Sequence, residues 1–84
     1  MEKCLTYNIL DVDYLKEKGN GLSRIVKEWL SENRVDALVY EFILDDNASF
    51  IVDYTFDEKN NKDKVEKLTE NILNRFNIPF ELKV

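Results

Sequence analysis

Histidine is absent from this chain of 84 residues, and cysteine, methionine, tryptophan and proline each occur once. Without histidine, the sequence lacks the side chain that serves most often as a general base and as a metal ligand in enzymes. Cys4, the single cysteine, has no imidazole to activate it and cannot form a disulfide within the chain. We therefore expect no catalytic residue, no cofactor and a reducing, cytoplasmic environment.

Long hydrophobic runs and low-complexity segments are missing too. No apolar stretch approaches the ~20 residues that a membrane-spanning helix needs, which argues against a membrane protein. Hydrophobic residues make up 44% of the chain and charged residues 35%, a balance typical of globular rather than disordered sequences. We expect a single domain covering residues 1–84.

An excess of basic residues is also lacking, because 17 acidic residues outnumber 12 basic ones and the net charge is −5. Broad nucleic-acid binding depends on a basic surface, so this charge argues against it. The charge has two interpretations: it keeps the protein soluble, or it matches a basic partner. We expect the partner to be another protein, and a basic one.

Apolar periodicity predicts four strands and two helices. Leu5, Tyr7 and Ile9 alternate as in a strand, and the change of phase near Ile9-Leu10 indicates either a bulge or the end of the strand. A polar stretch, 11–21, follows. The later elements are helix 22–30 between the capping residues Asn20 and Asn33, strands 35–44 and 49–56, helix 65–76 and strand 78–84.

The element order β-α-β-β-α-β is that of ferredoxin-like proteins. Right-handed crossovers then give a four-stranded antiparallel sheet of order 4-1-3-2 with both helices on one face. Pro79 falls on an edge strand, where a missing N–H is tolerated. The predicted fold class is therefore α+β, a ferredoxin-like sandwich.

The central hairpin has a predicted three-residue turn, Asp45-Asp46-Asn47. We prefer this register to a one-residue slip because it gathers the aromatic side chains of the hairpin on the core face. The predicted pairs are Phe42 with Phe50, Tyr40 with Val52, and Leu38 with Tyr54.

Strand 35–44 lies at an edge of the predicted sheet, yet its second face is still apolar. Long apolar edge strands invite pairing with another chain. We expect a partner protein to pair with this edge or to pack on the open sheet face, and a two-fold homodimer is the simplest form. An internal position for the strand is the alternative. The predicted partner-binding residues are Ala37, Val39, Glu41, Ile43, Ile51 and Asp53.

A glycine-containing loop precedes the first helix, with Lys16, Gly19, Asn20 and Gly21 as candidate ligand residues. A Gly-x-Gly loop that opens a helix can present backbone N–H groups to a pyrophosphate. Locally, segment 10–32 resembles the acetyl-CoA loop of the N-acetyltransferases, which implies binding of CoA. The resemblance covers about a quarter of the chain, and strand 49–56 stands where that family has a helix.

Acidic residues are expected to gather at one end of the sheet, and carboxylates are ligands that Mg²⁺ and Ca²⁺ prefer. Solvent-exposed loops are also rich in acidic residues, so we expect no bound metal.

The chain also resembles the small CRISPR-associated nucleases in its predicted fold, although Asn8 stands where their aspartate is expected. The weak metal-ligand candidates are Asp11, Asp13, Asp45 and Asp46.

The aromatic side chains also bear on RNA recognition, which uses aromatics on an open sheet face to stack bases. In the predicted register these side chains face the core, so we expect no such binding. Our main hypothesis is a non-enzymatic cytoplasmic binding module of the inhibitor or adaptor type, acting as a homodimer. The alternative is a ligand-binding or catalytic domain that uses CoA, a nucleotide or Mg²⁺ at the end of the sheet near Asp11, Asp13 and Gly19–Gly21.

Overall fold

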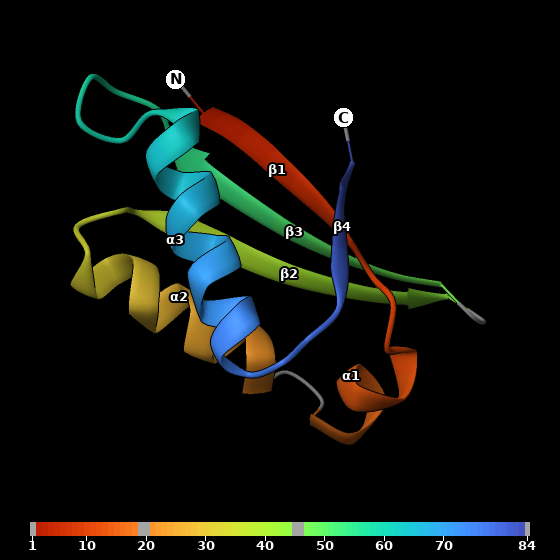
Figure 1. Ribbon diagram of the computed structural model, residues 1–84. Coiled ribbons are helices and arrows are strands. Elements are labelled where there is room, and N and C mark those ends of the chain that lie inside the picture. The colour runs from red at the N-terminus through yellow and green to blue at the C-terminus, as the bar shows by residue number, and fades with distance from the viewer. Residues whose placement is uncertain (1, 19–20, 45–46, 84) are drawn as a thin grey trace.

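The strands form one antiparallel sheet in a computed structural model that describes residues 2–18, 21–44 and 47–83 (Figure 1). Its strand order is β2–β3–β1–β4, which is 4-1-3-2 when read from the other edge. The class is α+β, as predicted. The strands are β1 (Glu2–Ile9), β2 (Ala37–Leu44), β3 (Asn47–Thr55) and β4 (Phe80–Lys83), and the helices are α1 (Val12–Lys18), α2 (Gly21–Glu32) and α3 (Lys62–Arg75).

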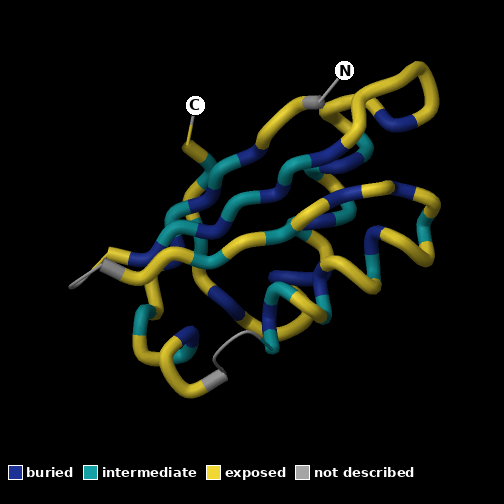
Figure 2. Tube along the Cα trace, turned by 180° about the vertical axis from the view of Figure 1, so that it is seen from behind, coloured by how far each residue is buried: buried dark blue, intermediate teal, exposed yellow. Residues whose placement is uncertain are grey.

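Helices α2 and α3 lie side by side on one face of the sheet, and the core fills the space between the two layers (Figure 1). Alternate residues of the central strands point into it, among them Leu5 and Tyr7 of β1 and Phe50 and Val52 of β3. The period-two pattern predicted these inward faces because helices cover only one side of the sheet. The opposite side, which we call the open face, is seen in Figure 2.

Helix α1 was not predicted, since residues 11–21 were expected to be a polar stretch. It contributes one fully buried side chain, Leu15, and its backbone begins after Asp11, whose Oδ1 accepts a hydrogen bond of 3.1 Å from Tyr14 N–H. Asp11 is therefore the N-cap of α1. Seven residues hold too few apolar positions to show the helical period, which explains the miss.

The hairpin register differs from the predicted one by one residue. Leu44 pairs with Asn47, so two residues separate the paired strands, and Phe42 pairs with Ser49 instead of Phe50. A slip of one residue moves every side chain of a strand to the opposite face. Leu38, Tyr40 and Phe42 of β2 therefore lie on the open face and not in the core.

Both long helices end in the same backbone motif. Arg34 has φ of 65° after α2, and Asn77 has φ of 56° after α3. Val35 N–H bonds to the carbonyl of Leu30 at 2.8 Å, while Arg34 N–H bonds to that of Ser31 at 3.0 Å, as in a Schellman motif. The predicted cap, Asn33, was wrong by one residue, since Arg34 takes the left-handed conformation.

The C-terminal strand is shorter than expected, because it begins at Phe80 and not at residue 78. Pro79 precedes it, and its carbonyl accepts a 3.0 Å hydrogen bond from Leu10 N–H. As predicted, β4 is an edge strand.

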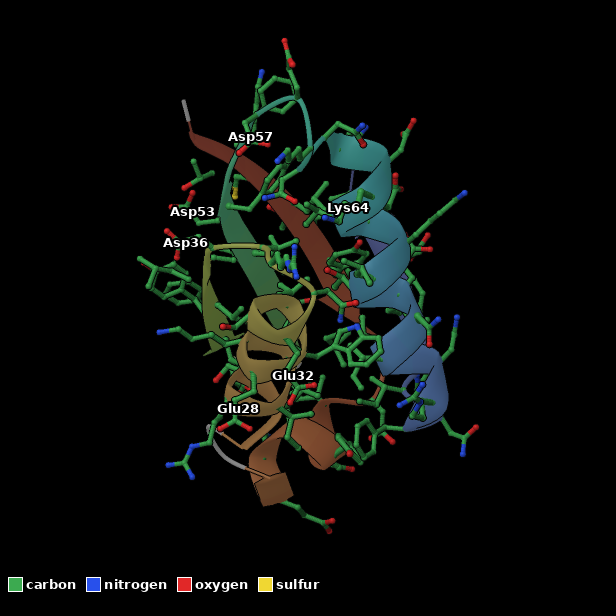
Figure 3. The ribbon with its side chains drawn as sticks, turned by 90° about the vertical axis from the view of Figure 1, so that its left-hand side faces the viewer. Glu28, Glu32, Asp36, Asp53, Asp57 and Lys64 are labelled. Atoms are coloured by element: carbon green, nitrogen blue, oxygen red, sulfur yellow. The ribbon has the colours of Figure 1, made fainter. Side chains whose placement is uncertain are left out.

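The connection between β3 and α3 is fastened to the end of α2 by Asn60, which is buried. Its side-chain amide donates to the carbonyl of Arg34 at 2.9 Å, and its Oδ1 accepts from Lys64 Nζ at 2.8 Å. Asp57 accepts from the backbone N–H of Asn60 at 2.7 Å (Figure 3). These bonds hold the sheet, α2 and α3 together at one end of the molecule.

Candidate protein-binding surface

Three large apolar side chains line the open face of β2 without cover. Leu38, Tyr40 and Phe42 are 50%, 41% and 56% exposed, and we call them the outer stripe. The rings of Tyr40 and Phe42 stack, with centroids 6.4 Å apart and planes inclined by 30°. Because exposed apolar surface of this kind is often used for binding, the outer stripe is the candidate interaction surface.

The residues predicted to form this surface divide between the two faces. Ala37, Val39, Glu41 and Ile43 lie on the helix-covered face, opposite Tyr54, Val52, Phe50 and Ala48 respectively. The prediction that these four residues lie on the open face was wrong, because the hairpin register is shifted by one residue from the predicted one. Ile51 and Asp53 do lie on the open face, half-buried beside the outer stripe, with Ile51 opposite Tyr40 and Asp53 opposite Leu38.

The sequence analysis singled out the strand that carries the outer stripe but not the three residues of the stripe itself. The pattern carried a signal for it, because Leu38, Tyr40 and Phe42 follow each other at every second position. Both faces of β2 are apolar, so alternation fixed which residues share a face but not which face is covered. The same error invalidates the argument that the hairpin aromatics all point into the core.

Acidic groups flank one end of the outer stripe. Asp53 lies across from Leu38, and Asp36 directly precedes β2. Asp36 and Asp53 line a shallow pocket of about 260 Å³ together with Leu38 (Figure 3). The Leu38 end of the outer stripe is thus bordered by two acidic residues, Asp36 and Asp53.

A groove of about 630 Å³ lies between α2 and the edge strand β2, and its lining includes Tyr40 and Phe42 of the outer stripe. Arg24 and Lys27 of α2 line it together with Val39 and Glu41 of β2. Glu41 accepts a 2.9 Å hydrogen bond from Ser23 N–H in the first turn of α2. Burial raises the pKa of the Glu41 carboxyl, while the bonds from Ser23 counteract that rise in part.

The predicted ligand loop is described only at its margins. Lys16 is exposed on α1, and Gly21 is the first residue of α2. Gly19 and Asn20 lie outside the described residues. At the opening of α2, the N–H of Ser23 is already occupied by the carboxylate of Glu41.

The acidic candidates for a metal site do not form a cluster where they are described. Asp11 caps α1, and Asp13 is exposed in the first turn of that helix. Asp45 and Asp46 lie outside the described residues. Among residues 2–18, 21–44 and 47–83, no group of three or more metal-ligating side chains comes together.

Cys4 is a free, exposed thiol on the open face of β1, and its Sγ lies 3.9 Å from the hydroxyl of Thr6. The open face of β1 continues with Thr6 and Asn8, which are half-buried. The centre of the open face is thus polar, and among the side chains that the structure describes its apolar part consists of the outer stripe and Ile51.

Comparison with protein-family models, curated proteins and solved structures finds no match for this chain. Within the part of the chain that the structure describes, no helix has the length and apolar character needed to cross a membrane.

Proposed function

We propose that this chain is a cytoplasmic protein-binding module of the inhibitor or adaptor type, with a ferredoxin-like fold to which α1 is added. The observation that carries the proposal is the outer stripe, which exposes a stacked aromatic pair on an edge strand. Aromatic side chains dominate the binding energy of protein interfaces because they bury a large area at a low entropic cost. The chemistry of the rest of the chain supports binding rather than catalysis, since the sequence contains no histidine.

The charge around the outer stripe specifies the kind of protein that would dock there. Asp53 and Asp36 lie at its Leu38 end, and the whole chain carries a net charge of −5. Complementary potentials steer association and exclude partners of like charge. The matching surface on the partner is an apolar cluster bordered by lysine or arginine.

The test is affinity capture from the native host with the wild-type chain and with a double variant, Tyr40→Thr with Phe42→Thr. Threonine favours strands, so the fold is expected to persist while the aromatic contacts are lost. Truncating two aromatic anchors should weaken binding at least tenfold, which corresponds to about 1.4 kcal/mol.

The matched control is Glu81→Thr with Lys83→Thr, which changes two exposed residues of β4 at the opposite edge of the sheet. A protein retained by wild type and control but lost from the outer-stripe variant supports the proposal. If the variant captures the same proteins in the same amounts, the outer stripe is not the binding surface.

A further inference from the structure

The two edges of the sheet are protected to different degrees, and the less protected one, β2, borders the groove beside α2. Edge strand β4 is four residues long, is preceded by Pro79 and exposes Glu81 and Lys83. Edge strand β2 is eight residues long. Short strands, prolines and charges are the features by which proteins prevent their edges from pairing with other chains. Of these features, β2 has only the single charge of Glu41.

The direction of the free backbone groups on β2 follows from one hydrogen bond. The carbonyl of Asp36 accepts from Thr55 N–H at 3.1 Å, so the backbone groups of Asp36 point toward β3. Successive residues of a strand direct these groups to alternate sides. The residues whose backbone groups point outward, toward the free edge, are therefore Ala37, Val39, Glu41 and Ile43.

The wall of the groove that α2 provides is basic. Arg24 and Lys27 line it and are exposed, and neither forms an ion pair with another residue that the structure describes. The acidic residues that follow on the same helix, Glu28 and Glu32, are not part of the groove lining (Figure 3). A free strand edge thus lies beside two cations that have no partner of opposite charge in the described part of the chain.

Along the groove, Lys27 lies level with Val39. The hydrogen bond from Ser23 N–H to the Glu41 carboxylate aligns the first turn of α2 with Glu41, and α2 and β2 run antiparallel (Figure 1). Lys27 follows Ser23 by about 6 Å along the helix axis. Val39 precedes Glu41 by about 7 Å along the strand. A side chain placed opposite Val39 on the free edge therefore faces Lys27, with Arg24 less than one helical turn away.

We propose that the groove receives an extended segment of a partner protein, which pairs with β2 as an additional strand and places a carboxylate opposite Val39, against Lys27 and Arg24. This inference rests on the proposed function, because it names the part of the partner that meets the strand carrying the outer stripe. Addition of a strand to a free sheet edge is a recurring mode of recognition, in which backbone hydrogen bonds give affinity and alternate side chains give specificity.

The two faces of β2 specify different side chains on the two sides of the added segment. Residues directly opposite each other in a sheet point to the same face, so the carboxylate opposite Val39 points to the helix-covered side. Its two neighbours in the segment lie opposite Leu38 and Tyr40 and point to the open face, where apolar side chains extend the outer stripe. The motif that fits is an aspartate or glutamate between two apolar residues.

Charge in the groove distinguishes this segment from other occupants. A lysine or arginine opposite Val39 would be repelled by Lys27. A second copy of this chain, paired about Tyr40, would bring the basic walls of the two grooves together. Its residue opposite Val39 would be Glu41, whose carboxylate is already bonded to Ser23 N–H of its own chain. A carboxylate from a different protein is free to meet the cations.

Fluorescence anisotropy with a labelled synthetic peptide tests the motif. The first probe alternates valine with threonine, replaces the central threonine by glutamate and carries a lysine at each end for solubility. The second probe has lysine in place of the glutamate. We expect the glutamate peptide to bind about tenfold more tightly, because its central side chain meets two cations. Equal binding of the two peptides, or no binding of the glutamate peptide, overturns the inference.

A charge-reversal variant, Arg24→Glu with Lys27→Glu, should reverse this preference, so that the lysine peptide binds more tightly. Both residues are exposed, so we expect the fold to persist. The matched control, Lys62→Glu with Lys67→Glu, makes the same change at exposed positions of α3 and should keep the wild-type preference. If the Arg24→Glu and Lys27→Glu variant still prefers the glutamate peptide, the carboxylate does not meet these cations.

Pairing with the strand edge is tested by Val39→Pro. Proline removes an outward-directed N–H, yet it is tolerated on an edge strand where that N–H faces solvent, and circular dichroism establishes that the variant is folded. We expect the glutamate peptide to bind Val39→Pro at least tenfold more weakly than Val39→Thr, which keeps the N–H. Equal binding to the two variants shows that the segment does not pair with β2.

The inference and the proposed function can fail separately in affinity capture from the native host. A protein lost with the Tyr40→Thr and Phe42→Thr variant, but retained by the Arg24→Glu and Lys27→Glu variant, overturns the segment and leaves the binding surface intact. A protein lost only with the second variant has the opposite meaning. Light scattering detects the competing occupant. A wild-type mass of two chains that falls to one in Val39→Pro assigns the edge to a second copy and overturns the inference.

Discussion

At the scale of single residues, the end of α2 holds a residue in a conformation that suits another amino acid better. Arg34 occupies the left-handed region at φ of 65°, which costs a residue with a Cβ roughly 1–2 kcal/mol. Glycine avoids this cost but loses about 0.5–1 kcal/mol more chain entropy on folding. The fold tolerates the strain at Arg34 because the hydrogen bonds of the Schellman motif and the packing of Val35 outweigh it.

We expect Arg34→Gly to stabilise the protein by about 0.5–1 kcal/mol, the difference between these two effects. For a domain of this size the melting temperature should rise by roughly 2–8 °C. Thermal unfolding followed by circular dichroism measures the shift. Asn77→Gly is the matched control at the end of α3 and should gain less, because asparagine adopts the left-handed conformation readily. A lower melting temperature for Arg34→Gly would contradict the strain argument.

A second residue, Thr69 of α3, carries a buried hydroxyl that has no hydrogen-bond partner among the described residues. An unpaired buried polar group costs about 1–3 kcal/mol. Thr69→Val keeps the shape and removes the hydroxyl, so we expect a gain of about 1 kcal/mol in chemical denaturation. Thr55→Val, at an exposed position, should change stability by less than about 0.5 kcal/mol. Destabilisation by Thr69→Val would show that the hydroxyl is paired after all.

At the scale of elements, α3 is joined to β1 through a group of acidic and phenolic side chains. Tyr7 donates a 3.3 Å hydrogen bond to Glu70 Oε2. Burial raises the pKa of the Glu70 carboxyl, and the neighbouring charge of Glu66 raises it further. Burial and the same two glutamates also raise the pKa of the Tyr7 hydroxyl, which therefore stays protonated.

The raised pKa of Glu70 sets the direction of a pH dependence. The folded state disfavours the ionised carboxylate, so this group stabilises the protein fully below its unfolded value of 4.5 and loses that contribution as pH rises through the folded value. Glu70→Gln keeps an acceptor for Tyr7 and removes the repulsion from Glu66. We expect a gain of about 0.2–0.5 kcal/mol at neutral pH, the size of a like-charged pair one helical turn apart.

Urea unfolding at a series of pH values measures this effect. Glu70→Gln should flatten the decline in stability above pH 4.5, whereas Glu58→Gln, in the exposed connection before α3, should leave the profile unchanged. If Glu70→Gln shows the same dependence of stability on pH as the wild type, Glu70 is not the source of that dependence.

Strands were easier to predict than their faces, and β2 shows why. In β1 the alternation sets apolar Leu5 and Tyr7 against Thr6 and Asn8, so the covered face is evident from the sequence. In β2 both sets are apolar, and the choice between them depended on aromatic size. That criterion failed because the aromatics are exposed, an arrangement that suits an interface better than an isolated domain.

At the scale of the whole molecule, the order of elements and the sheet neighbours followed from apolar periodicity and the handedness of crossovers. The candidate site was predicted only to the strand. The side chains that form the site could not be predicted. The observed hairpin turn is one residue shorter than the predicted one, which exchanges the two faces of β2, and no local signal in the sequence distinguishes a two-residue from a three-residue turn. Apolar periodicity could not reveal helix α1, since Leu15 is the one fully buried residue within 12–17, the part of the helix whose burial is described.

The position of β1 in the sheet has a consequence for synthesis of the chain. Strand β1 is translated first, yet its two neighbours are β3 and β4, which begin at residues 47 and 80. At about 5–20 residues per second, β1 waits for seconds with both edges unpaired while the rest of the chain leaves the ribosome. Its ladder contacts are distant in sequence, and such contacts slow folding. The nascent chain is thus most exposed to aggregation and to chaperones before β3 emerges.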